Sequence, residues 1–166
     1  MNDEYQGLMD LLASGDIEKL EEASLLIDDF PNGKDKFIQR DWIINAIDCG
    51  CLDSVKWMLE TGINLEFRDE EGITPLLSAI DRELPDKYEI IELLIKHGAP
   101  INKKGWNDWT PLHQAAARED IGALEILVKY GADLNIRTTI DDCATPLEEA
   151  KAMKRKKSVE FLKNVV

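Results

Sequence analysis

Residues 108–116 read Asp-Trp-Thr-Pro-Leu-His-Gln-Ala-Ala, and this stretch decides the fold because its Thr-Pro-Leu core recurs. The tripeptide stands at residues 74–76, 110–112 and 145–147, at offsets of 36 and 35 residues. A glycine follows each apolar segment, at Gly62, Gly98 and Gly131, at offsets of 36 and 33 residues. Two independent markers with nearly the same period indicate tandem structural repeats.

Each part of the repeat has a physical reason. The threonine hydroxyl can cap the free amides of a helix's first turn, and proline at the next position lacks an amide that would have no partner. The first helix carries small alanines, which let neighbouring helices approach closely. The second helix spaces its apolar residues for one buried face, as in Ala-Leu-Glu-Ile-Leu-Val at 123–128. The glycine then ends that helix in a left-handed conformation.

A helix pair of this kind cannot bury both of its faces alone, so the units must stack. The sequence therefore predicts an all-α solenoid of about five stacked helix pairs with short hairpin turns. We expect one domain over 1–166. It would divide into an N-terminal capping helix pair (4–35), repeats at 36–68, 69–104 and 105–139, and a C-terminal capping repeat (140–166). The concave face would be lined by the turn tips and the first helices.

Departures from the pattern predict local differences. Asp41-Trp42-Ile43 replaces Thr-Pro-Leu in the second unit, so Asp41 would cap the helix and Trp42 would pack on the preceding unit. Extra residues around Pro85 predict a longer loop between two helices, because proline cannot continue a helix. Trp57 lies on a second helix and is expected in the core or in the packing of the convex face.

From about residue 36 to 166 these features resemble the ankyrin repeat, most closely at 108–116 and 127–135. The resemblance implies a protein-binding module without catalytic activity. It also implies that His113, in Thr-Pro-Leu-His, is structural and bonds to the threonine and neighbouring turns.

Carried over position by position, the resemblance assigns partner binding to the turn tips and the exposed side of the first helices. The turn tips hold Phe37, Arg40, Arg68, Glu70, Glu71, Ile73, Trp106, Asn107, Trp109, Arg137, Asp141 and Asp142; the first helices hold Asp48, Asp81, Arg82, Ala117 and Arg118. The two tryptophans are the sharpest candidates, since exposed tryptophan near arginine is typical of an interface anchor. The alternative is that one of them covers the adjacent hairpin.

The formal net charge of −13 is unevenly distributed. Residues 1–150 carry 14 Lys/Arg against 32 Asp/Glu, whereas residues 151–166 carry six Lys/Arg against one glutamate. A field of the dominant negative sign attracts basic proteins and repels nucleic acid and anionic membranes, although acidity can also serve solubility alone. The basic run at 154–157 is interpreted as a solvated helical end rather than a nucleic-acid site.

Several kinds of chemistry lack their sequence signals. The three cysteines are odd in number and form no Cys-x-x-Cys pair, which fits a reducing compartment and predicts neither a metal nor a cofactor site. No apolar run approaches the roughly 20 residues of a membrane helix. The first ten residues lack a basic segment typical of secretory signals. We therefore expect a cytoplasmic protein that is not an enzyme and is monomeric when alone.

The predicted function is a non-catalytic scaffold that binds another protein, possibly a basic one. Small, acidic, stand-alone proteins of this kind also resemble bacterial immunity or antitoxin proteins that mask a basic toxin. A regulatory adaptor of an enzyme is a further alternative. An enzymatic role and a nucleic-acid role rank behind these.

Overall fold

The computed structural model describes residues 3–140 and 143–165, and within them it contains ten α-helices, one 3₁₀ turn and no strand. None of these helices is long and apolar enough to cross a membrane. The helices follow one another as five pairs. The first helices are α1 (Asp3–Ser14), α3 (Trp42–Cys49), α5 (Pro75–Asp81), α7 (Pro111–Arg118) and α9 (Pro146–Ala152); the second helices are α2 (Ile17–Leu26), α4 (Leu52–Glu60), α6 (Lys87–Lys96), α8 (Ile121–Lys129) and α10 (Lys156–Val165).

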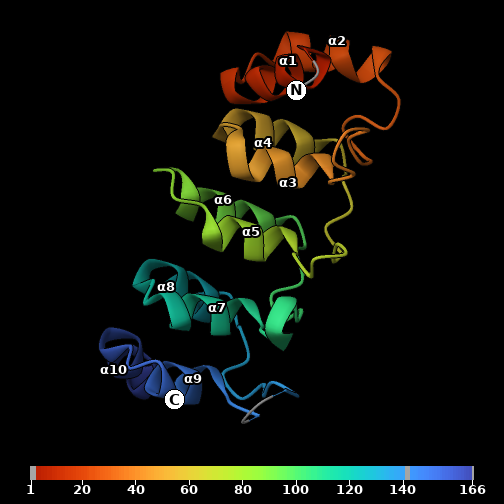
Figure 1. Ribbon diagram of the computed structural model, residues 1–166. Coiled ribbons are helices and arrows are strands. Elements are labelled where there is room, and N and C mark those ends of the chain that lie inside the picture. Colours follow the sequence, from red (N-terminus) through yellow and green to blue (C-terminus); the bar gives the residue numbers. More distant parts are fainter. Residues whose placement is uncertain (1–2, 141–142, 166) are drawn as a thin grey trace.

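The pairs stack in two layers (Figure 1). Each first helix packs on the next first helix, from α1 through α9, and the second helices form a parallel layer from α2 through α10. The turns that link the pairs project on one side of the stack, at the right of Figure 1. This arrangement confirms the predicted all-helical stack of repeats.

The helix boundaries follow the chemistry of the repeat. At Thr74, Thr110 and Thr145 the hydroxyl oxygen accepts a hydrogen bond from the amide three residues later, over 3.2, 3.4 and 3.3 Å. The next residue is proline at the first helical position of α5, α7 and α9. After the second helices, Gly98 and Gly131 have φ values of 90° and 84°, a region that favours glycine.

The start of the second pair agrees with the prediction at Trp42 and differs from it at Asp41. Trp42 is buried at 2% exposure and packs on the preceding unit, with its ring 5.2 Å from that of Phe30 and 6.4 Å from that of Tyr5. Its predicted contact is therefore confirmed. Asp41 occupies the N-cap position, but its side chain makes no capping hydrogen bond, so that prediction is wrong. Asp41 is partly buried, and this burial raises the pKa of its carboxyl group.

Buried Asp35 organises this hairpin in a way that the repeat pattern did not indicate. Its carboxylate accepts hydrogen bonds from the amides of Phe37 (2.9 Å), Ile38 (2.7 Å) and Arg40 (3.1 Å). It also accepts one from the Asn45 side chain on α3, over 3.2 Å. One carboxylate thus fixes the turn and attaches it to the helix that follows.

Two other local predictions hold. The loop around Pro85 separates α5, which ends at Asp81, from α6, which begins at Lys87. Trp57 on α4 is 8% exposed and lies against Phe30 at a ring distance of 5.9 Å. The buried Leu, Ile and Ala side chains of the two layers form one continuous core that runs from α1 to α10.

Candidate partner-binding surface

Neighbouring hairpin tips touch through their backbones. The Trp106 amide donates a hydrogen bond to the Gly72 carbonyl over 2.8 Å. Gly72 has φ of 85°, and a Cβ there would lie 2.9 to 3.1 Å from atoms of Trp106. Glycine is therefore required both for the turn and for the close approach of the next tip. This contact fixes where Trp106 stands relative to the preceding tip.

The two candidate tryptophans form a pair with different exposure. Trp106 begins the 3₁₀ turn η1 (Trp106–Asp108) and is 42% exposed, whereas Trp109 is half-buried. Their ring centroids are 5.9 Å apart and the rings are inclined at 54°. Asn107 and Asp108 both have left-handed backbones, with φ of 54° and 57°, and turn the chain between the rings.

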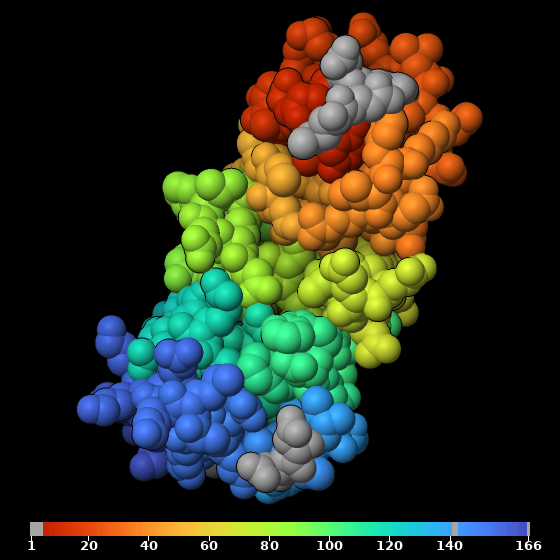
Figure 2. Space-filling view, in the orientation of Figure 1, coloured from red at the N-terminus to blue at the C-terminus, as the bar shows by residue number. Residues whose placement is uncertain are grey.

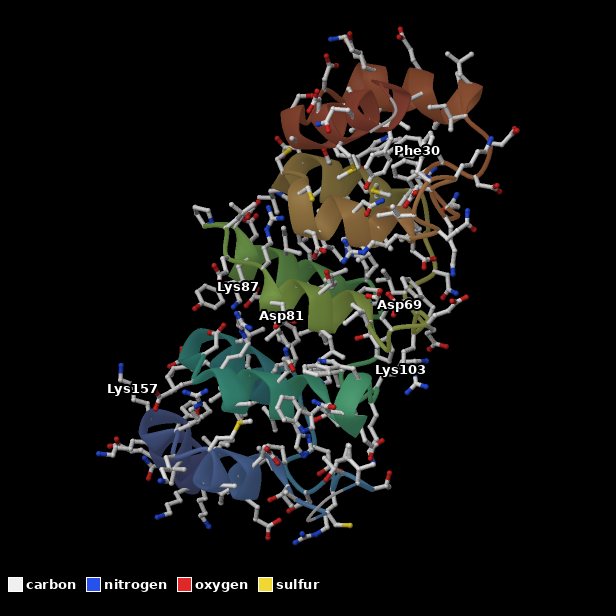
Figure 3. All side chains as sticks on the ribbon, viewed as in Figure 1. Phe30, Asp69, Asp81, Lys87, Lys103 and Lys157 are labelled. Atoms are coloured by element: carbon white, nitrogen blue, oxygen red, sulfur yellow. The ribbon has the colours of Figure 1, made fainter. Side chains whose placement is uncertain are left out.

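Two clefts border this pair. One, of about 500 Å³, is lined by Glu70, Glu71, Trp106 and neighbours from three successive tips. The other, of about 440 Å³, is lined by Trp109, Arg137 and residues of α9. Trp106 lines the first cleft and Trp109 the second. Asp69 and Lys103 mark the same row of tips in Figure 3, on the side of the stack opposite Lys87 and Lys157.

Four predicted residues of this face form two ion pairs, one within a repeat and one between repeats. Arg40 forms an ion pair with Asp48, which also accepts a hydrogen bond from the Ser78 hydroxyl on the next first helix. Asp81 lies 3.1 Å from the Arg118 guanidinium, one repeat further on. It also accepts a bond from the Gln114 amide over 2.6 Å. These carboxylates therefore link consecutive first helices along the inner layer.

Arg82 is a correction to the predicted site. It is 4% exposed, so it is not available to a partner. Its guanidinium donates to the carbonyl oxygens of Ile47 and Gly50, the latter over 2.8 Å. It also forms two bonds of 2.9 Å with Asp86. The longer loop after α5 turns this side chain inward, where it joins the end of α3 to the start of α6.

The other predicted residues fall into three groups. Arg68, Glu70, Glu71, Asn107 and Arg137 are exposed on the tips, as is Phe37 at 42% exposure, although its ring also packs edge-on to Tyr5 at 5.5 Å. Ile73 is half-buried, and Ala117 is buried, which removes it from an accessible surface. Asp141 and Asp142 lie outside the described residues.

His113 has the structural role implied by the repeat. It is fully buried, and its Nδ1 lies 2.8 Å from the Thr110 hydroxyl and 3.3 Å from the Thr110 amide. Its Nε2 lies 3.0 Å from the Ala144 carbonyl oxygen. The amide donor at Nδ1 and the carbonyl acceptor at Nε2 together define a neutral ring protonated at Nε2. Burial lowers the pKa of this histidine, which favours the same neutral form.

Asp108 is a residue of this surface that the sequence interpretation missed. Its carboxylate accepts hydrogen bonds from the Lys104 ammonium (2.8 Å) and from the backbone amide and hydroxyl of Thr139, the latter over 2.8 Å. The Lys104 hydrogen bond is the main cause of the lowered pKa of Asp108. Lys104 also donates to the Arg137 carbonyl over 2.8 Å. The 31-residue separation of Asp108 and Thr139, close to the repeat period, is the signal that could have suggested this contact.

Comparison with known proteins agrees with this architecture. The family model "Ankyrin repeats (3 copies)" matches residues 8–105, 43–138 and 87–164. Similar proteins include the B-cell lymphoma 3 protein homolog of Mus musculus, 30% identical over 108 residues, which are 64% of this chain and 23% of that protein. The RelA-associated inhibitor of Mus musculus is 36% identical over 107 residues, 64% of this chain and 12% of that protein.

A plant protein is similar to this chain over a comparable length. The putative E3 ubiquitin-protein ligase XBAT35 of Arabidopsis thaliana is 34% identical over 112 residues, 66% of this chain and 23% of that protein. The matches thus span less than a quarter of the length of these relatives. Ankyrin repeats are modules of protein–protein interaction and are generally non-catalytic. With its capped helix pairs, glycine-ended second helices and matched repeats, this chain belongs to the ankyrin-repeat family.

Proposed function

We propose that this chain is a non-catalytic scaffold that binds a partner protein through its turn tips and first helices. The observation that carries the proposal is the Trp106–Trp109 pair. Trp106 leaves 42% of its surface exposed although it stands on a tip that is hydrogen-bonded to its neighbour. Tryptophan is among the residues that contribute most energy at protein interfaces. The side chain therefore provides an apolar anchor at a defined position.

The free charge on this surface favours a basic partner. Arg40, Arg118 and Arg137 are already paired with carboxylates of the same face. Glu70 and Glu71 are exposed beside Trp106, and neither forms an ion pair with another described residue. Arg68 lines the same cleft and also forms no ion pair with a described residue, so the surface offers a partner an apolar ring next to two carboxylates and one guanidinium, with a net negative charge. Such complementarity contributes mainly to association rate and specificity.

The experiment compares capture of partners by the native chain and by Trp106→Ala. A protein that the native chain retains would be identified by mass spectrometry, purified and titrated against both. We expect the substitution to weaken binding by about tenfold or more, the loss for an interface anchor of more than about 1.4 kcal/mol. The melting temperature should equal that of the native chain, because the Trp106 ring lies outside the hydrophobic core.

Leu84→Ala is the matched control, since Leu84 is also exposed, at 44%, but lies in the loop between α5 and α6. It should bind as the native chain does. Equal affinity of Trp106→Ala and the native chain for every purified partner would contradict the proposal. A loss of affinity that is matched by a loss of thermal stability would make the tryptophan structural instead.

A masking role is the second candidate function, as for an immunity protein that covers a basic toxin. It is supported by the free acidic charge at the tips and by the likeness to a relative named as an inhibitor. A regulatory adaptor would bind without suppressing its partner's activity. Adding the chain to the purified partner in equal amount distinguishes them, because masking predicts inhibition that Trp106→Ala relieves. The free thiols of Cys49, Cys51 and Cys143 are consistent with such action in a reducing cytoplasm.

A further inference from the structure

The last helix pair carries a group of cations without ion-pair partners. Every residue from 151 to 157 is exposed, and this segment joins α9 to α10. We call its five cations, Lys151, Lys154, Arg155, Lys156 and Lys157, the basic turn. Their side chains form no ion pair with any other described residue, whereas the arginines at 82, 118 and 137 are all paired. This positive charge is therefore uncompensated in a chain of net charge −13.

The first helix pair carries the opposite feature. Glu18, Glu21 and Glu22 on α2 are exposed, and none forms an ion pair with a described residue. Leu25 and Leu26 follow on the same helix and are 86% and 83% exposed. Residues four apart share one side of a helix, so Glu21 adjoins Leu25 and Glu22 adjoins Leu26. We call these five residues the acidic face.

The two surfaces lie at opposite ends of the stack. Figure 1 places α2 at the top and α10 at the bottom, with the pairs from α3 to α8 between them, and Figure 2 shows the same elongated body in space-filling form. The layers are in continuous contact from the first pair to the last. One copy therefore cannot bring its basic turn to its own acidic face.

We propose that the basic turn of one copy binds the acidic face of a second copy, so that the chains associate head to tail. The charges are complementary, and each surface includes exposed apolar atoms, because Met153 in the segment of the basic turn is 41% exposed. Contact would remove the Leu25 and Leu26 side chains, which are largely exposed in the free monomer, from water. Leu25 and Leu26 are far more exposed, at 86% and 83%, than Trp106 beside the carboxylates of the tips, at 42%, and this distinguishes the acidic face from that surface.

Association of this kind has a recognisable form. The two contacting surfaces differ, so each new contact leaves one free basic turn and one free acidic face. The assembly therefore grows beyond a dimer as concentration rises. It is also sensitive to salt, because charges on an exposed surface are screened over about 10 Å at 0.1 M and about 3 Å at 1 M ionic strength.

Sedimentation equilibrium of the purified chain tests this directly. At low ionic strength the weight-average mass should rise with concentration from the 18.8 kDa of the monomer past the mass of a dimer. Addition of salt to about 1 M should return it to the monomer value. A mass that stays at 18.8 kDa at every concentration and salt level would overturn the proposal.

A charge exchange makes the test specific. One variant carries Glu18→Lys, Glu21→Lys and Glu22→Lys, and the other carries Lys154→Glu, Arg155→Glu and Lys156→Glu. Each alone should remain monomeric, since its two surfaces have the same sign. An equal mixture should associate again, although both proteins remain negative overall. A mixture that stays monomeric while the native chain associates would show that these surfaces do not meet.

The matched control carries Glu60→Lys, Glu66→Lys and Glu125→Lys, three exposed positions outside both surfaces. It changes the net charge as much as the first variant does and should associate like the native chain. A loss of association in this control would assign the effect to net charge and overturn the proposal. Thermal melts verify that each variant is folded. Binding of duplex DNA by a native chain that shows no self-association would assign the basic turn to nucleic acid instead.

Discussion

The Nε2 of His113 lies 3.0 Å from the carbonyl oxygen of Ala144, so a first helix of one repeat is bonded to the turn that precedes the next. The bond uses the neutral ring. Protonation would place a charge in a buried site and turn Nδ1 from an acceptor into a donor facing the Thr110 amide. One hydrogen bond between α7 and the turn before α9 thus depends on the protonation state of this imidazole.

This dependence predicts a loss of stability in mild acid. Because burial lowers the pKa of folded His113, the unfolded chain binds the proton first. The contribution of His113 to the free energy of unfolding is complete above its pKa in the unfolded chain, about 6.5. It declines as pH falls below that value, by at most about 1.4 kcal/mol per pH unit. Urea unfolding at pH 8 and pH 5 should show a smaller decline for His113→Asn than for the native chain. His97→Asn, at an exposed helix end, serves as control and should decline like the native chain.

The buried guanidinium of Arg82 predicts a large effect of truncation. Arg82→Ala removes the donors to two carbonyl oxygens and to Asp86, so we expect the free energy of unfolding to fall by about 3 kcal/mol. Arg68→Ala, at an exposed tip, should change it by less than about 0.5 kcal/mol. Guanidinium chloride titrations measure both. Equal stability of the two variants would show that the inward guanidinium contributes little.

Alanine substitutions at two glycines with similar backbone conformations distinguish the cost of backbone strain from the cost of a steric contact. Gly72 and Gly62 have φ of 85° and 78°, but only at Gly72 would a Cβ meet another atom within 4 Å. Alanine at either site should cost about 1 kcal/mol for the left-handed conformation. Gly72→Ala should cost at least about 1 kcal/mol more, because it presses on the Trp106 backbone. Thermal unfolding of the two variants checks the difference, and equal melting temperatures would refute the close contact of the tips.

Glu148 completes a capping box at the start of α9 and predicts an acid transition of its own. Its pKa is lowered to about 2, mainly by the hydrogen bond from the Thr145 amide and next by the hydrogen bond from Arg137. Because the pKa of Glu148 is lower in the folded chain than in the unfolded chain, its ionised carboxylate stabilises the fold above the unfolded pKa of about 4.3. This stabilisation is lost as pH falls toward about 2. The carboxyl carbon of Glu148 should therefore titrate near pH 2 by NMR. Arg137→Gln should move that titration upward, and an unchanged midpoint would contradict the ion pair.

Much of the fold could be predicted because the repeat places a distinctive residue at each structural transition. Thr110 and Pro111 mark a helix start by local hydrogen bonding and geometry alone. The packing of Trp42 was also predictable, since a large aromatic side chain at a helix start must be covered by the neighbouring unit. Such features depend on interactions within a few residues or between adjacent repeats.

The binding surface was harder to predict because exposure depends on how loops turn. Arg82 was expected on the accessible side of a first helix, but the helix ends one residue earlier and the loop directs its side chain inward. Asp35 was missed because its carboxylate collects donors whose spacing in sequence follows no helical or repeat rule. Asp108 was missed although its separation from Thr139 is close to the repeat period. The turn beside Gly105 predicted that both tryptophans would be exposed; Trp106 is exposed, whereas Trp109 is half-buried.

The backbone bond between Trp106 and Gly72 has a consequence for the thermodynamics of recognition. A tip held by its neighbour has already lost much of the conformational entropy that a free loop would lose on binding. The bonds from Lys104 and Thr139 extend the same restraint to the following tip. A partner would therefore meet a preorganised row of side chains, and more of the contact energy would appear as affinity.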